Sequence, residues 1–100
     1  MADIKRAVEK LSGSGSIGKE GEQQYQVKYE LTVYRKFIVA GSEELPSSHS
    51  VQGTIAGISA EMMFDCLGQI LILTMRDSRK VQGLFIDSNG HFQGTGPIYD

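Results

Sequence analysis

Residues 69 to 92 constrain the fold of this chain more than any other stretch. Two apolar runs, Ile70–Leu73 and Val81–Ile86, are separated by the polar residues 76–79, and the second run ends at an Asp-Ser-Asn-Gly sequence over residues 87–90. Short apolar runs bounded by Asp, Ser, Asn and Gly are typical of strands joined by tight turns. We therefore predict a β-meander with a last strand that starts at His91 and ends at Gly94–Pro97, and the rest of the chain must complete its sheet.

Residues 25–39 carry the longest strand signal. Apolar residues occupy every second position of its first part: Tyr25, Val27, Tyr29, Leu31 and Val33. Strict alternation predicts a strand with one face in a core and the other in water. The alternation blurs after Val33, and a β-bulge near Tyr34–Lys36 would repair it by switching the register.

The segment that follows contains one loop, one strand and one ambiguous stretch. Gly41–Ser50 is rich in Gly, Ser and acids and includes Pro46, which predicts a loop. Val51–Ile58 predicts a second strand, interrupted by two glycines that favour a bend. The spacing of the apolar residues over Ser59–Gly68 decides little between a helical turn and a strand, and we favour extended structure there.

The N-terminal segment predicts a short amphipathic helix. Over residues 2–11, the apolar residues Ile4, Ala7, Val8 and Leu11 recur at spacings of three, four and seven. Such a short helix is marginal alone in water, so we expect it to dock on the Ile70–Leu73 run. Residues 12–24 are rich in Gly and Ser and favour a flexible connector, although an edge strand over residues 14–17 that closes a barrel is the alternative.

These elements predict one small, mainly β domain. The expected fold is a small antiparallel up-and-down barrel or half-open sandwich of about five to seven strands, with one short N-terminal helix. Residues 1–22 would form the helix and the Gly/Ser-rich connector, and residues 23–100 the single β domain. A chain of 100 residues has a modest core, so self-association would help to bury apolar surface.

Charge and cysteine content bound the possible partners. The net charge of −2 gives no reason to expect nucleic-acid binding. No apolar run approaches the length of a membrane span, and residues 1–11 carry scattered charges unlike a signal peptide. Cys66 is the only cysteine, which excludes an intrachain disulfide and favours a reducing, cytoplasmic location.

Several motif-like patterns lack the context that their chemistry requires. Residues 13–18, GSGSIG, match a dinucleotide fingerprint, and Lys19 extends the match to a phosphate-binding loop. Both motifs need a strand before them and a helix after them, whereas here an expected helix precedes and a polar segment follows. Cys66 lies between apolar residues, which favours an inert thiol. One cysteine and two histidines give no usual metal spacing, so we expect no cofactor, no metal and no catalytic residue.

Three residues form the candidate ligand site, namely Tyr25, Tyr29 and Arg35. Without a bulge, Arg35 would point to the same side of its strand as the two tyrosines, where a buried guanidinium needs an ion pair or an anionic ligand. With a bulge, Arg35 would lie in solvent, and we favour this second arrangement because buried arginine is rare.

Two functions remain after these exclusions. The preferred hypothesis is a non-catalytic binding or regulatory module that acts through protein–protein contacts, as a homodimer or with another protein. The alternative is a barrel that binds a small molecule, or a small enzyme, with an anion-recognising mouth at Tyr25, Tyr29 and Arg35. A fold alone decides neither, because one architecture serves many functions.

Overall fold

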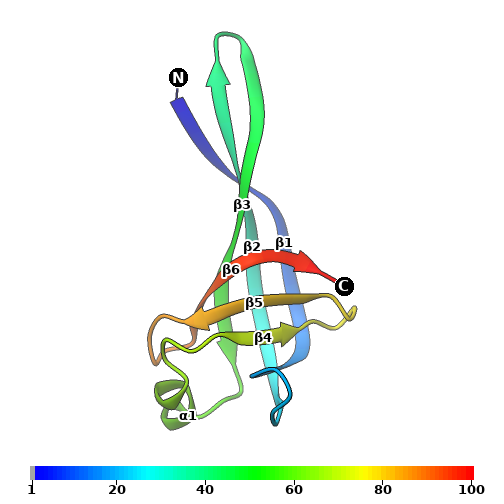
Figure 1. Ribbon diagram of the computed structural model, residues 1–100, viewed down its shortest axis with the longest axis vertical. Coiled ribbons are helices and arrows are strands. Elements are labelled where there is room, and N and C mark those ends of the chain that lie inside the picture. Colours follow the sequence, from blue (N-terminus) through cyan, green and yellow to red (C-terminus); the bar gives the residue numbers. More distant parts are fainter. Residues whose placement is uncertain (1) are drawn as a thin grey trace.

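A computed structural model describes residues 2–100 as six antiparallel strands and one short helix (Figure 1). The strands form a closed barrel in the order β1-β2-β3-β6-β5-β4, which confirms the expected small antiparallel barrel. The elements are β1 (Ala2–Gly18), β2 (Tyr25–Ala40), β3 (Glu43–Ala56), α1 (Ala60–Asp65), β4 (Leu71–Thr74), β5 (Lys80–Phe85) and β6 (His91–Tyr99).

The barrel consists of two three-stranded meanders. Strands β1, β2 and β3 pair in chain order, as do β4, β5 and β6. The meanders meet where β3 pairs with β6 through Gln52–Thr54 and where β1 pairs with β4 through Ser16–Gly18. The connection from β3 to β4 runs through α1, so this helix lies at one end of the barrel (Figure 1).

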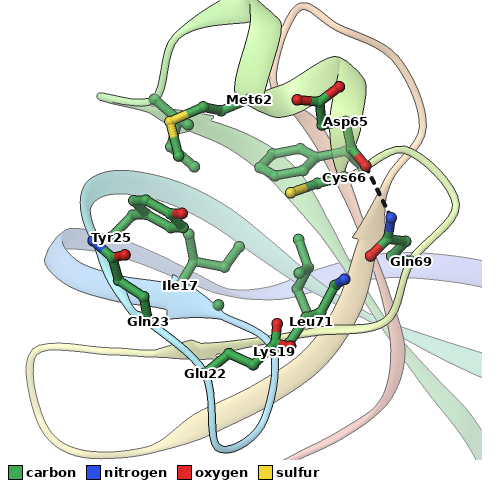
Figure 2. Close-up of a pocket in the computed structure, with 13 residues that line it drawn as sticks. Ile17, Lys19, Glu22, Gln23, Tyr25, Met62, Asp65, Cys66, Gln69 and Leu71 are labelled. Carbon is green, nitrogen blue, oxygen red and sulfur yellow. Dashed lines mark hydrogen bonds between the residues drawn. The ribbon is translucent and has the colours of Figure 1, made fainter.

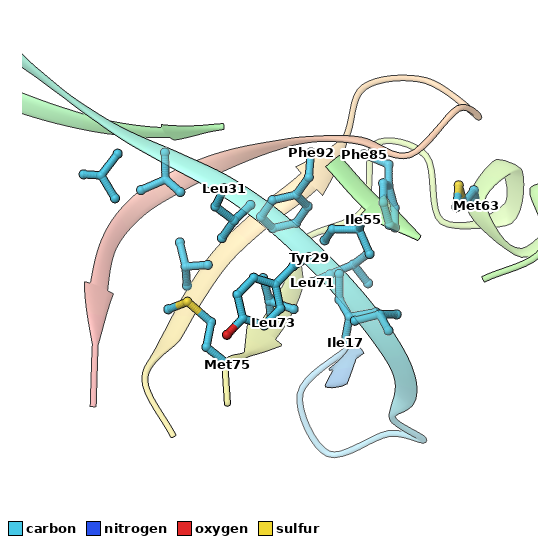
Figure 3. Close-up of a cluster of buried hydrophobic side chains, with 14 residues drawn as sticks. Ile17, Tyr29, Leu31, Ile55, Met63, Leu71, Leu73, Met75, Phe85 and Phe92 are labelled. Carbon is cyan, nitrogen blue, oxygen red and sulfur yellow. The ribbon is translucent and has the colours of Figure 1, made fainter. Parts of the chain in front are cut away.

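The barrel interior is packed with apolar side chains (Figure 3). The expected alternation in β2 is confirmed, because Val27, Tyr29, Leu31 and Val33 are all buried. The rings of Phe85 and Phe92 pack edge to face with centroids 6.0 Å apart, a favourable aromatic geometry. The buried residues of this core are Ile17, Val27, Tyr29, Leu31, Val33, Val51, Ile55, Met63, Leu71, Leu73, Met75, Val81, Phe85 and Phe92.

The prediction of a helix over residues 2–11 is wrong, because these residues begin β1 and pair with β2. The register shifts between Ala7 and Glu9, which leaves Val8 as an extra residue. Such a bulge lets Ile4 and Leu11 face the same side, although their odd spacing would separate them in a regular strand. Residues 12–18 continue the strand and close the barrel, which confirms the edge-strand alternative and overturns the flexible connector.

Strands β1, β2 and β3 continue beyond the barrel as a three-stranded arm (Figure 1). We define the arm as residues 3–10, 34–40 and 43–50. The loop predicted over Gly41–Ser50 is wrong, since only a tight turn at residues 41–42 separates β2 from β3. Among residues 2–100, β1 before Ser16 and β3 before Gln52 pair only with β2. The arm is therefore a sheet that no other described element covers.

The segment after β3 also corrects the expectation, because α1 replaces the favoured extended structure. The Ser59 hydroxyl accepts a hydrogen bond from the Met62 amide at 3.3 Å and so caps the helix. Met63 anchors α1 in the core. No helix among residues 2–100 is long and apolar enough to span a membrane.

The predicted meander is confirmed in β4, β5 and β6. At its second turn, the Asp87 carboxylate accepts a hydrogen bond from the Asn89 amide at 2.8 Å, and Gly90 has a φ of 92°. Strand β6 continues through Pro97 to Tyr99, so the expected end at Gly94–Pro97 is wrong.

Candidate functional site

The three candidate residues lie at different places along β2. Tyr25 is partly buried at the barrel end near α1, whereas Tyr29 is 5% exposed and belongs to the core. The Tyr29 hydroxyl accepts a hydrogen bond from the Arg76 amide at 3.1 Å. Arg35 is ten residues beyond Tyr25, which corresponds to about 33 Å along an extended strand. The structure therefore does not bring Tyr25 and Arg35 into one mouth.

Arg35 keeps the regular alternation of β2. Register shifts lie near the predicted bulge at Tyr34–Lys36, but the extra residues belong to β1, at Val8, and to β3, between Pro46 and His49. The side chain of Arg35 consequently shares the face of Val33 and Phe37. Its Nε is buried and has no hydrogen-bond partner among residues 2–100, and the residue as a whole is half-buried, so Arg35 is neither fully in solvent nor enclosed in the core.

One ion pair helps to stabilise the arm, and it lies on the face of the arm that continues the barrel interior. Both terminal nitrogens of Arg6 donate to the Glu44 carboxylate at 2.7 Å, and the guanidinium lies 5.3 Å from the centroid of the Phe37 ring. The bidentate hydrogen bond lowers the pKa of Glu44 and raises the pKa of Arg6. Arg6 is thus neutralised within the arm, whereas no salt bridge of Arg35 is found among residues 2–100.

The opposite face of the arm, which we call the outer face, carries an apolar centre between charges of opposite sign. Ile38 pairs with both Asp3 and Leu45, which places these three residues in one row across the sheet. Lys5 and Lys36 pair in the next row toward the barrel. The Lys5 ammonium lies 4.6 Å from the Tyr34 ring centroid. Toward the tip, Glu43 pairs with Ala40 in the next row.

A cavity of about 330 Å³ lies at the other end of the barrel, beneath α1 (Figure 2). Figure 2 shows Tyr25, Ile17 and Leu71 on the barrel side, and Met62 and Cys66 on the α1 side. The residues that line it are Ile17, Gly18, Lys19, Glu22, Gln23, Tyr25, Ile58, Met62, Asp65, Cys66, Gln69, Leu71 and Phe85.

Hydrogen bonds fix two of the segments that form the walls of this cavity. Gln24 donates hydrogen bonds to the backbone oxygens of Lys19 and Glu22, at 3.1 and 3.0 Å, and so fixes the turn after β1. A Cβ on Gly18 would lie 2.6 Å from the Gln23 carbonyl oxygen, so only glycine lets this turn approach so closely. On the other side, Gln69 donates to the Asp65 carbonyl at 2.9 Å (Figure 2).

Two further charged pairs stabilise turns at the surface. The Asp87 carboxylate lies 2.5 Å from Nδ1 of His91, and this hydrogen bond lowers the pKa of Asp87. Arg79 donates from Nε to Asp77 at 2.7 Å, which lowers the pKa of Asp77. Among residues 2–100, no group of three His, Cys, Asp or Glu side chains is placed to hold a metal ion.

Sequence reasoning missed the cavity because its walls come from four separate segments. The one local signal was the spacing of Met62 and Cys66, since residues four apart share a face if the segment is helical. Comparisons of the chain with protein-family models, curated proteins and solved structures found no match.

Proposed function

We propose that this protein is a non-catalytic binding module that associates with a second copy of itself through the outer face of the arm. The observation that carries the proposal is the projection of a three-stranded sheet with apolar side chains that no other described element covers. Leu45 is 48% exposed in this sheet. A small domain buries a limited share of its apolar surface on folding, so an interface with a second copy removes more of that surface from water.

The distribution of charge supports a second copy as the partner. The tip of the outer face is acidic at Glu43, Asp3 lies beside the apolar centre in the row of Ile38, and the part nearer the barrel is basic at Lys5 and Lys36. If two arms stack antiparallel about a two-fold axis near Ile38, the acidic tip of each lies over the basic part of the other. A two-fold interface uses the same patch on both copies, so each favourable contact occurs twice.

The strand edges of the arm support contact through the face instead. On β3, Pro46 has no amide hydrogen to donate, and a bulge lies between Pro46 and His49. On β1, the extra residue Val8 interrupts regular pairing. Bulges and proline protect exposed edges from pairing with other chains. The outer face is therefore the better contact surface of the arm.

The position of Cys66 supports a reducing, cytoplasmic location for this module. Cys66 is a free thiol and partly exposed to solvent. Free thiols persist more readily where disulfides are kept reduced.

Light scattering coupled to size-exclusion chromatography tests the proposed association. We expect a dimer of the full chain, and a monomer for Leu45→Asp, because the added carboxylate would be buried at the apolar centre of the interface. The matched control is Ile86→Asp, which changes an exposed apolar residue, 61% exposed, outside the arm. This control should remain dimeric.

Two outcomes would overturn self-association through the arm. One is a full chain that stays monomeric at every concentration, which would direct the search to a different protein partner. The other is a dimer that Leu45→Asp leaves intact while Ile86→Asp dissociates it, which would place the interface on the barrel. Circular dichroism of both variants verifies that they are folded.

A further inference from the structure

The cavity beneath α1 has the features of a binding site for a small molecule. Its volume of about 330 Å³ lies at the lower end of the range for ligand pockets. It lies at the barrel end, between β-strands on one side and α1 on the other, and it borders one end of the packed interior. The cavity lies apart from the arm, so a ligand here is independent of the proposed self-association.

The deep part of the cavity is apolar. Ile17, Leu71 and Phe85 are nearly inaccessible to solvent and form its floor, and Ile58 and Met62 add partly buried side chains. Apolar surfaces of this kind favour an apolar occupant, because the occupant removes both surfaces from water.

The polar groups gather at the rim. Lys19, Glu22 and Asp65 line the opening, so one cation stands against two anions. An anionic ligand would meet net repulsion there and would lose hydration at the apolar floor. The hydroxyl of Tyr25 and the amide of Gln23 offer hydrogen bonds to one neutral polar group (Figure 2).

We propose that this cavity binds a small, uncharged and largely apolar molecule that carries one polar group at the rim. The ligand lies between the floor residues and the α1 side chains Met62 and Cys66. The cavity is too small for a folded partner, and no step of covalent chemistry is required. Tyr25, one of the candidate residues predicted from the sequence, takes part in this site, whereas Tyr29 and Arg35 do not line it.

A pair of fluorescent probes with one aromatic skeleton tests the proposal. N-phenyl-1-naphthylamine is uncharged, and 8-anilino-1-naphthalenesulfonate adds a sulfonate to the same rings. We expect saturable binding of the uncharged probe at one site per chain. The sulfonated probe should bind at least about tenfold more weakly, because its charge would lie at an acidic rim over an apolar floor.

Two substitutions on α1 locate the probe. Met62→Trp adds a large side chain to the cavity and should weaken binding of the uncharged probe by about tenfold or more. Phe64→Trp places the same new side chain two residues along the helix at a position that is 67% exposed, and it should leave binding unchanged.

Alkylation of Cys66 gives a readout that needs no variant. Cys66 is the only cysteine of the chain and lines the cavity, so a saturating concentration of N-phenyl-1-naphthylamine should slow its reaction with iodoacetamide several-fold. The proposal is overturned if the uncharged probe shows no saturable binding, if the sulfonated probe binds equally well, or if Cys66 reacts at the same rate with and without the probe. Should Met62→Trp fail to fold, the protection of Cys66 decides.

Discussion

Replacing Gly83 with alanine should destabilise the barrel where β5 crosses the core. A Cβ at this position would lie 2.4 Å from Cζ of Phe92 and 2.5 Å from the Gln93 carbonyl oxygen. Neither neighbour can move easily, because Phe92 is 1% exposed and packs on Phe85, and the carbonyl belongs to β6. Forcing extra volume into a packed core costs about 1–3 kcal/mol.

This cost corresponds to a fall of about 4–24 °C in melting temperature, since a domain of this size shifts by roughly 4–8 °C for each kcal/mol. Gly96→Ala is the matched control on the neighbouring strand, because no atom lies within 4 Å of the added Cβ and its φ is not positive. The control should gain about 0.4–1 kcal/mol from the reduced entropy of the unfolded chain. Thermal and urea unfolding, followed by circular dichroism, measure both variants.

If Gly83→Ala were as stable as Gly96→Ala, the contact with Phe92 would not limit the size of the residue at position 83. If both variants lost the same stability, the effect would belong to glycine replacement in a strand and not to the contact with Phe92.

Three further predictions follow from the core and from the charged turns. Leu73→Ala should lower the free energy of unfolding by about 2–5 kcal/mol in urea titrations, because Leu73 is fully buried. Tyr29→Phe should cost about 1 kcal/mol in the same assay, because the Arg76 amide loses its acceptor. Asp77 and Asp87 have pKa values below the ordinary 3.8 because each accepts a side-chain hydrogen bond, so their stabilisation is present above about pH 4 and is lost as pH falls through the lowered values. Between about pH 4 and pH 2, the free energy of unfolding should therefore fall less in Asp87→Asn than in the unmodified chain.

The sequence predicted the elements whose signals are local. The meander of β4, β5 and β6 follows from short apolar runs between turn-forming residues, and β2 follows from its strict alternation. The turn at Asp87 was predictable because its carboxylate and Gly90 each suit a defined turn position.

The errors arise where a bulge or distant pairing changes the pattern. In β1 the extra residue Val8 brings Ile4 and Leu11 to one face, which imitates the seven-residue spacing of a helix. The first half of β3 lies in the arm and is exposed to solvent, so its mostly polar residues resemble a loop. These residues nevertheless pair with β2, as Glu43 does with Ala40. Pairing with a strong neighbouring strand overrides the weak propensity of such residues.

The candidate sites show the same limit. The sequence singled out Tyr25 and Arg35, but the distance between them depends on β2 being one long strand that continues into the arm. The walls of the cavity come from segments whose meeting requires the closure of β1 on β4 and the placement of α1. Neither of these features has a local sequence signal.

Chemical cross-linking at the centre of the outer face tests the proposed self-association most directly. In a Cys66→Ser background, Ile38→Cys provides one thiol at this centre, and a short bis-maleimide can bridge thiols on sheets that stack about 10 Å apart. We expect a rapid covalent dimer of twice 11.0 kDa, whereas Ile86→Cys in the same background should stay monomeric. Equal cross-linking of the two variants, or none with Ile38→Cys, would rule out self-association through the outer face.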